Sequence, residues 1–175
     1  MADETANGAA GAAQTAAPQL NLQKIYVKDS SFEVPHAPQI FREEGQPELQ
    51  MNIGQKITSV DENTREVVLE VTVTCTIGDK TAYLAEVQQA GIFGITGFDR
   101  QQQEAVLATY CSNALFPYVR QSIGDLVQGG GFPPLLLQPI NFEQLYAEQV
   151  RRRAEQQGQA APAADAAAES SADNA

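Results

Sequence analysis

The sequence has few of the side chains that build metal and nucleic-acid sites. It contains no tryptophan, one histidine (His36), two cysteines (Cys75 and Cys111), and 11 basic residues against 22 acidic ones, for a formal net charge of −11. A protein that coats a phosphate backbone needs clustered lysine and arginine, so nucleic-acid binding is disfavoured. A structural zinc site needs four ligands, and two cysteines with one histidine do not supply them, so zinc is disfavoured as well.

Long apolar runs are also missing. No stretch approaches the roughly 18 apolar residues of a transmembrane helix, and the first residues lack the basic region and apolar run of a signal peptide. We therefore expect a soluble, cytoplasmic protein whose two thiols stay reduced.

The two ends of the chain differ in composition from its centre. Residues 1–18 and 158–175 consist largely of alanine with glycine, glutamine, serine, proline and aspartate, and have almost no large apolar side chain. Such segments cannot bury enough surface to offset the entropy of ordering them, so both are predicted to be flexible tails. Residues 19–157 are then one domain with one modest core.

Strand patterns fill the first half of that domain. Residues 66–77 alternate, with apolar side chains at every odd position from Val67 to Ile77, which is the period of a half-buried strand. Gly78 and Asp79 suit a tight hairpin that leads into a partner strand over residues 81–89. Shorter strands are predicted over residues 21–28 and 48–53.

Helical patterns follow the strands. Asp99 is a predicted N-cap for a first helix, Ser112 or Asn113 for a second, and Asn141 for a third whose closing turns hold the three arginines at 151–153. Strands followed by helices indicate an α+β protein, with an antiparallel sheet and helices on one face.

The uncovered face of that sheet carries an unusual mixture of side chains. The alternation places Glu66, Val68 and Glu70 on it, together with Leu84 and Glu86 from the next strand. Carboxylates beside exposed aliphatic side chains are not typical of a surface that meets only water. Two interpretations remain open, a docking surface for a partner and an ordinary polar sheet face.

No pattern in the sequence indicates catalysis. Cys111 and His36 could be proposed as nucleophile and base, but Cys111 borders an apolar helical pattern and no orienting group is evident. The glycines at 129–131 lack the Gly-Lys-Ser/Thr of a phosphate loop and precede Phe-Pro-Pro, so they are predicted to end a helix. We expect no catalytic residue, no metal and no cofactor.

Apolar side chains also occupy segments that have no regular period. Residues 32–41 and the run GFPPLLLQPI at 131–140 combine large apolar side chains with prolines. Either these segments cover the core beneath them, which the residues alone favour, or they line an open apolar groove together with the last helix.

Several of these runs resemble the SecB family of bacterial protein-export chaperones. They are IYVKDSSFEVPHAPQIF (25–41), VVLEVTVT (67–74), AEVQQAGIF (85–93), ALFPYVR (114–120) and GGFPPLLLQPINFEQLY (130–146). The likeness covers about residues 20–150 in the right order, and the agreement of several separate motifs makes it specific.

The resemblance implies a fold, an activity and partners. The protomer would have a four-stranded antiparallel sheet and assemble as a dimer of dimers, a homotetramer with its helices between the dimers. Without a nucleotide, it would hold non-native precursor proteins in the cytosol and pass them to the export ATPase SecA. A SecB-like chaperone dedicated to a toxin–antitoxin system is the alternative function, because it uses the same fold.

The resemblance also implies two sets of binding residues. The contact with SecA would use Asp29, Glu33, Leu84 and Glu86. The groove for unfolded clients would be lined by Phe32, Val34, Ile40, Phe41, Leu135, Leu137, Phe142, Leu145 and Tyr146. This chain departs from the family at Gly45, where family members have a tryptophan, and in a longer, alanine-rich amino-terminal extension.

Overall fold

The computed structural model describes residues 17–160 and confirms an α+β order of elements. Most of the two predicted tails lies outside these residues, although the last helix continues past the predicted boundary after residue 157. The elements are β1 (Gln19–Glu33), a 3₁₀ turn (Gln39–Arg42), β2 (Pro47–Ser59), β3 (Thr64–Ile77), β4 (Lys80–Thr96), α1 (Arg100–Val106), a π-helical turn (Leu107–Cys111), α2 (Ser112–Gly129) and α3 (Phe142–Ala160).

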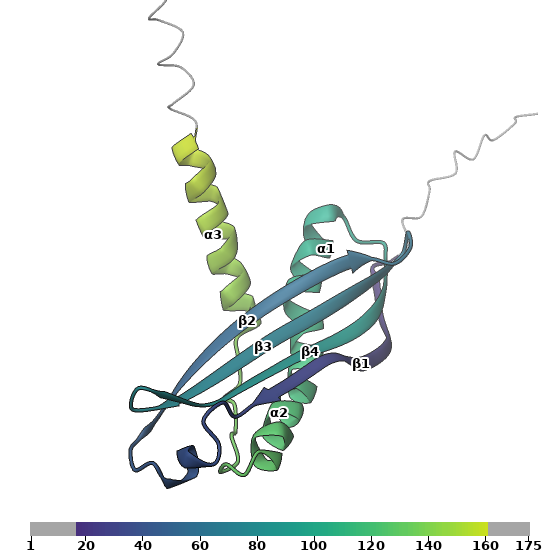
Figure 1. The fold of residues 1–175 in the computed structure, drawn as a ribbon. Helices are drawn as coiled ribbons and strands as arrows, with labels where there is room; N and C mark the ends of the chain where they lie inside the picture. The colour runs from purple at the N-terminus through teal and green to yellow at the C-terminus, as the bar shows by residue number, and fades with distance from the viewer. Residues whose placement is uncertain (1–16, 161–175) are drawn as a thin grey trace, which may run out of the picture.

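The strands form one antiparallel sheet in the order β1-β4-β3-β2, as Figure 1 shows. The predicted hairpin between β3 and β4 is confirmed, and its two-residue turn uses Gly78 at φ 61°, a backbone conformation that favours glycine. Because β1 and β2 occupy opposite edges of the sheet, residues 34–46 must cross from one edge to the other. We call these residues the crossing segment.

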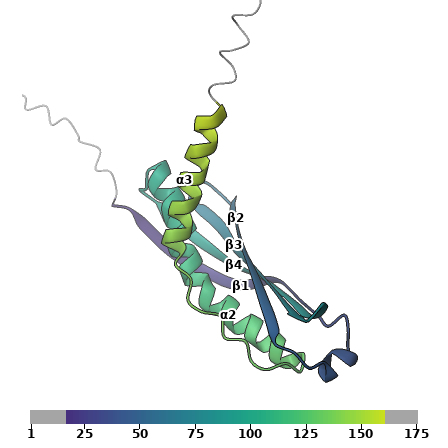
Figure 2. The ribbon, with the colours of Figure 1, turned by 90° about the vertical axis from the view of Figure 1, so that its left-hand side faces the viewer.

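The helices gather on one face of the sheet, which we call the inner face (Figure 2). Helix α2 packs against β4 and β3 through Leu115, Val119, Ile123 and Val127, each fully buried. These side chains meet the odd-numbered row of β3, from Val67 to Cys75, which the alternation predicted to be buried. No helix within residues 17–160 covers the opposite face, which we call the outer face.

Strand β2 is longer than predicted and less buried. Its apolar side chains lie opposite the odd-numbered row of β3 that faces the helices, yet Leu49 and Met51 are exposed. The prediction of a half-buried strand over residues 48–53 is wrong in this respect, because α2 lies over the two central strands and leaves the β2 edge uncovered.

The first two predicted helices form one continuous helical segment. Asp99 caps α1 as predicted: its carboxylate accepts a hydrogen bond from the Gln102 amide at 2.8 Å, and the Gln102 side chain accepts one from the Asp99 amide at 3.2 Å. Ser112 and Asn113 do not cap a second helix, because the backbone is already helical at Cys111 and runs through the π-helical turn into α2.

Helix α3 begins where predicted and extends further. Asn141 Oδ1 accepts a hydrogen bond from the Gln144 amide at 3.0 Å, as expected of an N-cap. The arginines at 151–153 lie within the helix and not in its closing turns, because it continues to Ala160. The far end of α3 projects beyond the sheet in both views (Figures 1 and 2).

Strand β1 contains two bulges, which explains why its pattern predicted only residues 21–28. The pairing with β4 shifts between Leu22 and Lys24 and again between Val27 and Asp29, so Gln23 and Lys28 are extra residues. Each bulge reverses which side chains face inward, and no simple alternation is therefore visible in the sequence.

Candidate functional site

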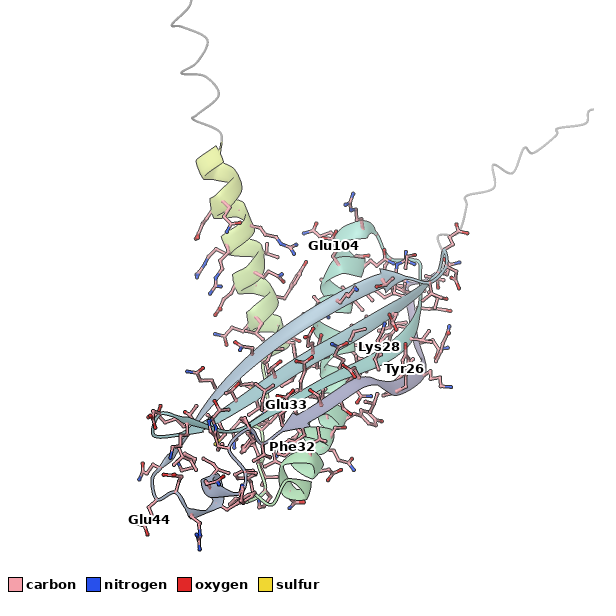
Figure 3. The ribbon with its side chains drawn as sticks, in the orientation of Figure 1. Tyr26, Lys28, Phe32, Glu33, Glu44 and Glu104 are labelled. Carbon is pink, nitrogen blue, oxygen red and sulfur yellow. The ribbon has the colours of Figure 1, made fainter. Side chains whose placement is uncertain are left out.

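The four residues of the proposed acidic contact share the outer face near one end of β1. Glu33 pairs with Leu84, and Asp29 with Gln88, while Glu86 lies opposite Ser31. The side chains of Asp29 and Glu33 are exposed, and those of Leu84 and Glu86 are half-buried. We call this group, Asp29, Glu33, Leu84 and Glu86, the acidic patch. Figure 3 labels Glu33 at the end of β1.

The outer face is less apolar than the sequence predicted. Val68 lies on it, as the alternation requires, but only 4% of its surface is exposed. The prediction that Val68 is an exposed aliphatic is therefore wrong. Leu84, half-buried, remains as the apolar member of the acidic patch.

A second polar group lies further along the same face, and the sequence did not reveal it. The Tyr26 hydroxyl donates a hydrogen bond to Glu66 Oε1, and Lys28 Nζ lies 2.9 Å and 2.7 Å from the two oxygens of the same carboxylate. These contacts to Lys28 and Tyr26 lower the pKa of Glu66 below its ordinary value. Tyr26 and Glu66 are 40 residues apart in the sequence, so no local pattern could reveal the group.

A groove with both apolar and polar side chains in its lining, among them Arg65, Arg100 and Arg153, lies between β2, α1 with the π-helical turn, and α3. Its volume is about 610 Å³, and one wall is formed by Phe142, Leu145 and Tyr146 from α3. The opposite wall, which the sequence did not reveal as part of the site, is formed by Ile53, Ile57, Leu69 and Leu107.

A glutamine side chain in the lining of this groove joins the sheet to the helices. Gln55 Nε2 donates to the Leu107 carbonyl at 2.8 Å and to Ser112 Oγ at 2.7 Å. The contact ties β2 to the π-helical turn, where the helical hydrogen-bond pattern changes. The groove therefore rests on a fixed junction between the sheet and the helices.

A cluster of aromatic rings lies at the other end of the sheet, beneath the crossing segment. Phe32 stacks on Tyr83 at 5.8 Å between ring centroids, Tyr83 meets Phe132 at 4.8 Å, and Phe132 meets Phe41 at 5.2 Å. Gly130 lies directly against the Phe32 ring. Tyr83 and Phe132 were not among the predicted client residues, although the cluster depends on them.

In the protomer, the predicted client residues lie in separate places. Phe142, Leu145 and Tyr146 line the groove beside β2, whereas Phe32 and Phe41 belong to the aromatic cluster. Val34 and Leu135 are half-buried and pack against the core. Ile40, Leu137 and Phe142 are buried, so these side chains are part of the core in the protomer.

Gly45 lies in the crossing segment close to the end of β3. A Cβ atom at this position would be 3.0 Å from Ile77 Cγ2. A larger side chain there would have to displace Ile77 or turn away from it, so the crossing segment packs closely at this glycine.

The thiols are placed as structural side chains. Cys111 is fully buried, and burial raises its pKa to about 12, so it remains protonated and unreactive at neutral pH. The ring of His36 contacts the Thr81 carbonyl oxygen, 3.0 Å from Nδ1, in the crossing segment and not beside Cys111. Within residues 17–160, no three His, Cys, Asp or Glu side chains are grouped in a way that could hold a metal ion.

The fold thus presents two candidate binding surfaces, an acidic patch on one face of a sheet and a partly apolar groove beside the other. Residues 13–153 match the protein family described as preprotein translocase subunit SecB. The protein-export protein SecB of Xanthomonas oryzae is 59% identical over 155 residues, which cover 87% of this chain and 91% of that protein. The corresponding protein of Stenotrophomonas maltophilia is 57% identical over 157 residues, covering 89% and 91%.

The chain therefore belongs to the SecB family of protein-export chaperones. The members of this family are not enzymes, which confirms the prediction that the chain has no catalytic role. A solved SecB-like chaperone of Mycobacterium tuberculosis, bound to a peptide from an antitoxin, shares the fold with a TM-score of 0.59 and 18% identity over 70% of this chain and 91% of its own. Among the described residues, no helix has both the length and the apolar character needed to cross a membrane.

Proposed function

We propose that this protein holds non-native precursor proteins in the cytoplasm without using ATP and delivers them to the export ATPase SecA. The observation that carries the proposal is the 59% identity, over nearly the whole chain, to a protein-export protein. The groove between β2 and α3 supports it, because an unfolded chain exposes apolar segments that the apolar part of the groove's lining can remove from water.

The proposed client surface extends beyond the groove itself. Leu145 on α3 and Ile57 on β2 are each more than two-fifths exposed at its rim, and Leu49 and Met51 continue the apolar row along β2. Exposed aliphatic side chains in a row are uncommon on a surface that meets only water. Such a row can accept extended segments of many sequences, because hydrophobic contact has no directional requirement.

A toxin–antitoxin chaperone is the weaker proposal. The relative solved with an antitoxin peptide is 18% identical to this chain, whereas the protein-export relatives are above 50% identical. Preference of the purified protein for one endogenous partner over export precursors would favour the weaker proposal.

The first test is an aggregation assay without nucleotide. A chemically denatured precursor protein is diluted into buffer with or without a stoichiometric amount of this protein, and light scattering is followed over time. We expect scattering to be suppressed and to be unaffected by added ATP, because binding competes with aggregation by mass action alone. Equal scattering with and without the protein would contradict the holding function.

The proposed docking site for SecA is the acidic patch. It carries three carboxylates and a half-buried leucine on a face that none of the described helices covers, which suits a partner segment with basic and apolar side chains. We expect Glu86→Lys to weaken SecA binding at least tenfold at low salt, because a like charge replaces an attractive one.

The matched control for Glu86→Lys is Glu48→Lys. Glu48 is an exposed carboxylate on the outer face of β2, at the edge of the sheet away from β1. This variant has the same change in net charge outside the acidic patch, and suppression of aggregation should be retained in both. If the two variants bind SecA equally, the assignment of the patch is wrong.

A further inference from the structure

The orientation of the acidic patch depends on one extra residue in β1. Between the two bulges, the even-numbered Lys24 and Tyr26 pair with outer-face residues of β4. After the extra residue Lys28, the odd-numbered Asp29 and Glu33 occupy the outer face. Without this second bulge, the side chains of Asp29 and Glu33 would point toward the helices.

The hydrogen bonds to Glu66 come from two residues at this bulge. Tyr26 precedes the shift in pairing, and Lys28 is the extra residue itself. Both side chains reach across β4 to Glu66 on β3, so the contact joins β1 to a strand that it does not pair with. Figure 3 labels Tyr26 and Lys28 next to each other on the outer face.

The energetics of the cluster favour a fixed geometry. The side chain of Glu66 is 13% exposed and that of Lys28 is 43% exposed, so the carboxylate is largely removed from water while its partner remains accessible. Hydrogen bonds to a charged group are stronger than neutral ones, and here two donors meet one carboxylate. The lowered pKa of Glu66 agrees with this arrangement, because both donors favour the charged form.

The far end of the same segment is held separately. Phe32 faces inward and stacks on Tyr83, which fixes the strand just before Glu33. The residues between Lys28 and Phe32 therefore lie between two anchors, one on each face of the sheet. Loss of the anchor at Glu66 would loosen Asp29 more than Glu33.

We propose that Tyr26, Lys28 and Glu66 form a clamp that holds the bulge in β1 and thereby presents Asp29 and Glu33 to the basic partner. The three are positioning residues for the acidic patch and do not themselves contact that partner. The docking role of the patch belongs to the proposed function, on which this inference rests.

Removing the positive charge of Lys28 distinguishes a positioning role of this residue from a direct electrostatic effect on partner binding. Lys28→Met removes a positive charge close to a surface that is proposed to attract a basic partner, and charge alone would therefore strengthen binding. Loss of the clamp would weaken it. Lys24→Met is the matched control, because Lys24 lies on the same strand and face and no hydrogen bond or ion pair to Glu66 is formed by it.

The first experiment measures SecA binding at low salt for the full-length variants. We expect Lys28→Met to weaken binding roughly fivefold, the order expected when one charge-assisted hydrogen bond is lost, and Lys24→Met to leave binding unchanged or tighter. Tyr26→Phe removes only a hydroxyl and should weaken binding about threefold with no change in charge. Suppression of client aggregation should be the same in all three variants.

The second experiment measures, in the absence of SecA, how closely β1 is held against β4. Ser31 and Glu86 face each other on the outer face, so the pair Ser31→Cys and Glu86→Cys should form a disulfide on mild oxidation. Adding Lys28→Met should slow this cross-link severalfold, and adding Lys24→Met should not. The native Cys75 and Cys111 are buried and should not compete.

The two experiments fail in different ways. If the wild-type protein does not bind SecA, the docking role of the acidic patch is wrong, and the cross-linking rates still decide whether the clamp exists. If Lys28→Met binds SecA as tightly as Lys24→Met and cross-links at the wild-type rate, the clamp is refuted. Weaker binding with an unchanged cross-linking rate would also refute it, because Lys28 would then contact the partner directly.

Discussion

At the scale of single residues, the end of α2 shows how one missing methyl group can shape a binding surface. Helix α2 ends with hydrogen bonds from the Gly131 amide to the Gln128 carbonyl and from the Phe132 amide to the Val127 carbonyl. Gly131 has a φ of 85°, which favours glycine. Gly130 has a helical backbone that any residue can adopt. Glycine is needed there for lack of space, because a Cβ would lie 2.1 Å from the Phe32 ring.

We expect Gly130→Ala to displace Phe32 from its stack on Tyr83 and to lower the free energy of unfolding by about 1–2 kcal/mol, as overpacking does elsewhere. Gly129→Ala is the control, because a Cβ at Gly129 meets no atom within 4 Å and alanine favours a helix. That variant should be neutral or more stable. Urea unfolding at one fixed protein concentration measures both, and equal stabilities would show that Phe32 yields without cost.

At the scale of elements, the sequence was sufficient wherever the signal is local. The hairpin at Gly78, the N-caps at Asp99 and Asn141, and the stop after Gly129 each depend on residues within four positions of one another, and all four are confirmed. The outer-face positions of Leu84 and Glu86 also followed from the alternation within β4, because the one shift in its pairing with β3, at Ala82, comes before them.

The elements that were predicted poorly depend on distant contacts. The bulges of β1 are fixed by pairing with β4 and, as we propose, by Glu66, which is 40 residues from Tyr26. The π-helical turn joins two helices that capping signals alone would separate, and its Leu107 carbonyl bonds to Gln55 on a distant strand. Propensity cannot encode such contacts, because they exist only once the sheet has formed.

The candidate site divides in the same way. Strand parity placed Leu84 and Glu86 of the acidic patch on the outer face, and only the family resemblance added Asp29 and Glu33. The client residues were expected to line one groove, yet Phe142 and Phe32 belong to different surfaces, and Tyr83 and Phe132 were missed. Which apolar side chains remain open depends on where α2 and α3 lie over the sheet, and no local pattern encodes that placement.

At the scale of the whole molecule, the β1 edge carries the signs of an interface. In the part of the chain that the structure describes, strand β1 is an edge strand that pairs with β4 on one side only. Leu22 and Val27 are exposed on its inner face, and a hollow of about 450 Å³ between β1 and α2 is lined by Val27, Phe32 and Leu126. We propose that two protomers join along this edge, and that two such dimers form a homotetramer through their helical faces, where Tyr110 and Tyr118 are exposed.

The proposed assembly predicts opposite outcomes for two valines of similar exposure. Val27, 50% exposed, lies on the β1 edge, whereas Val60, 58% exposed, lies in the turn between β2 and β3. We expect Val27→Glu to shift the particle below the tetramer mass, because it places a carboxylate in an interface that brings two copies together. Val60→Glu adds the same charge elsewhere and should keep the wild-type mass. Light scattering coupled to size exclusion, over a range of concentrations, measures both. A wild-type mass for Val27→Glu at micromolar concentration would place the dimer contact on another edge, and the exposed apolar row on β2 would then be the next surface to test.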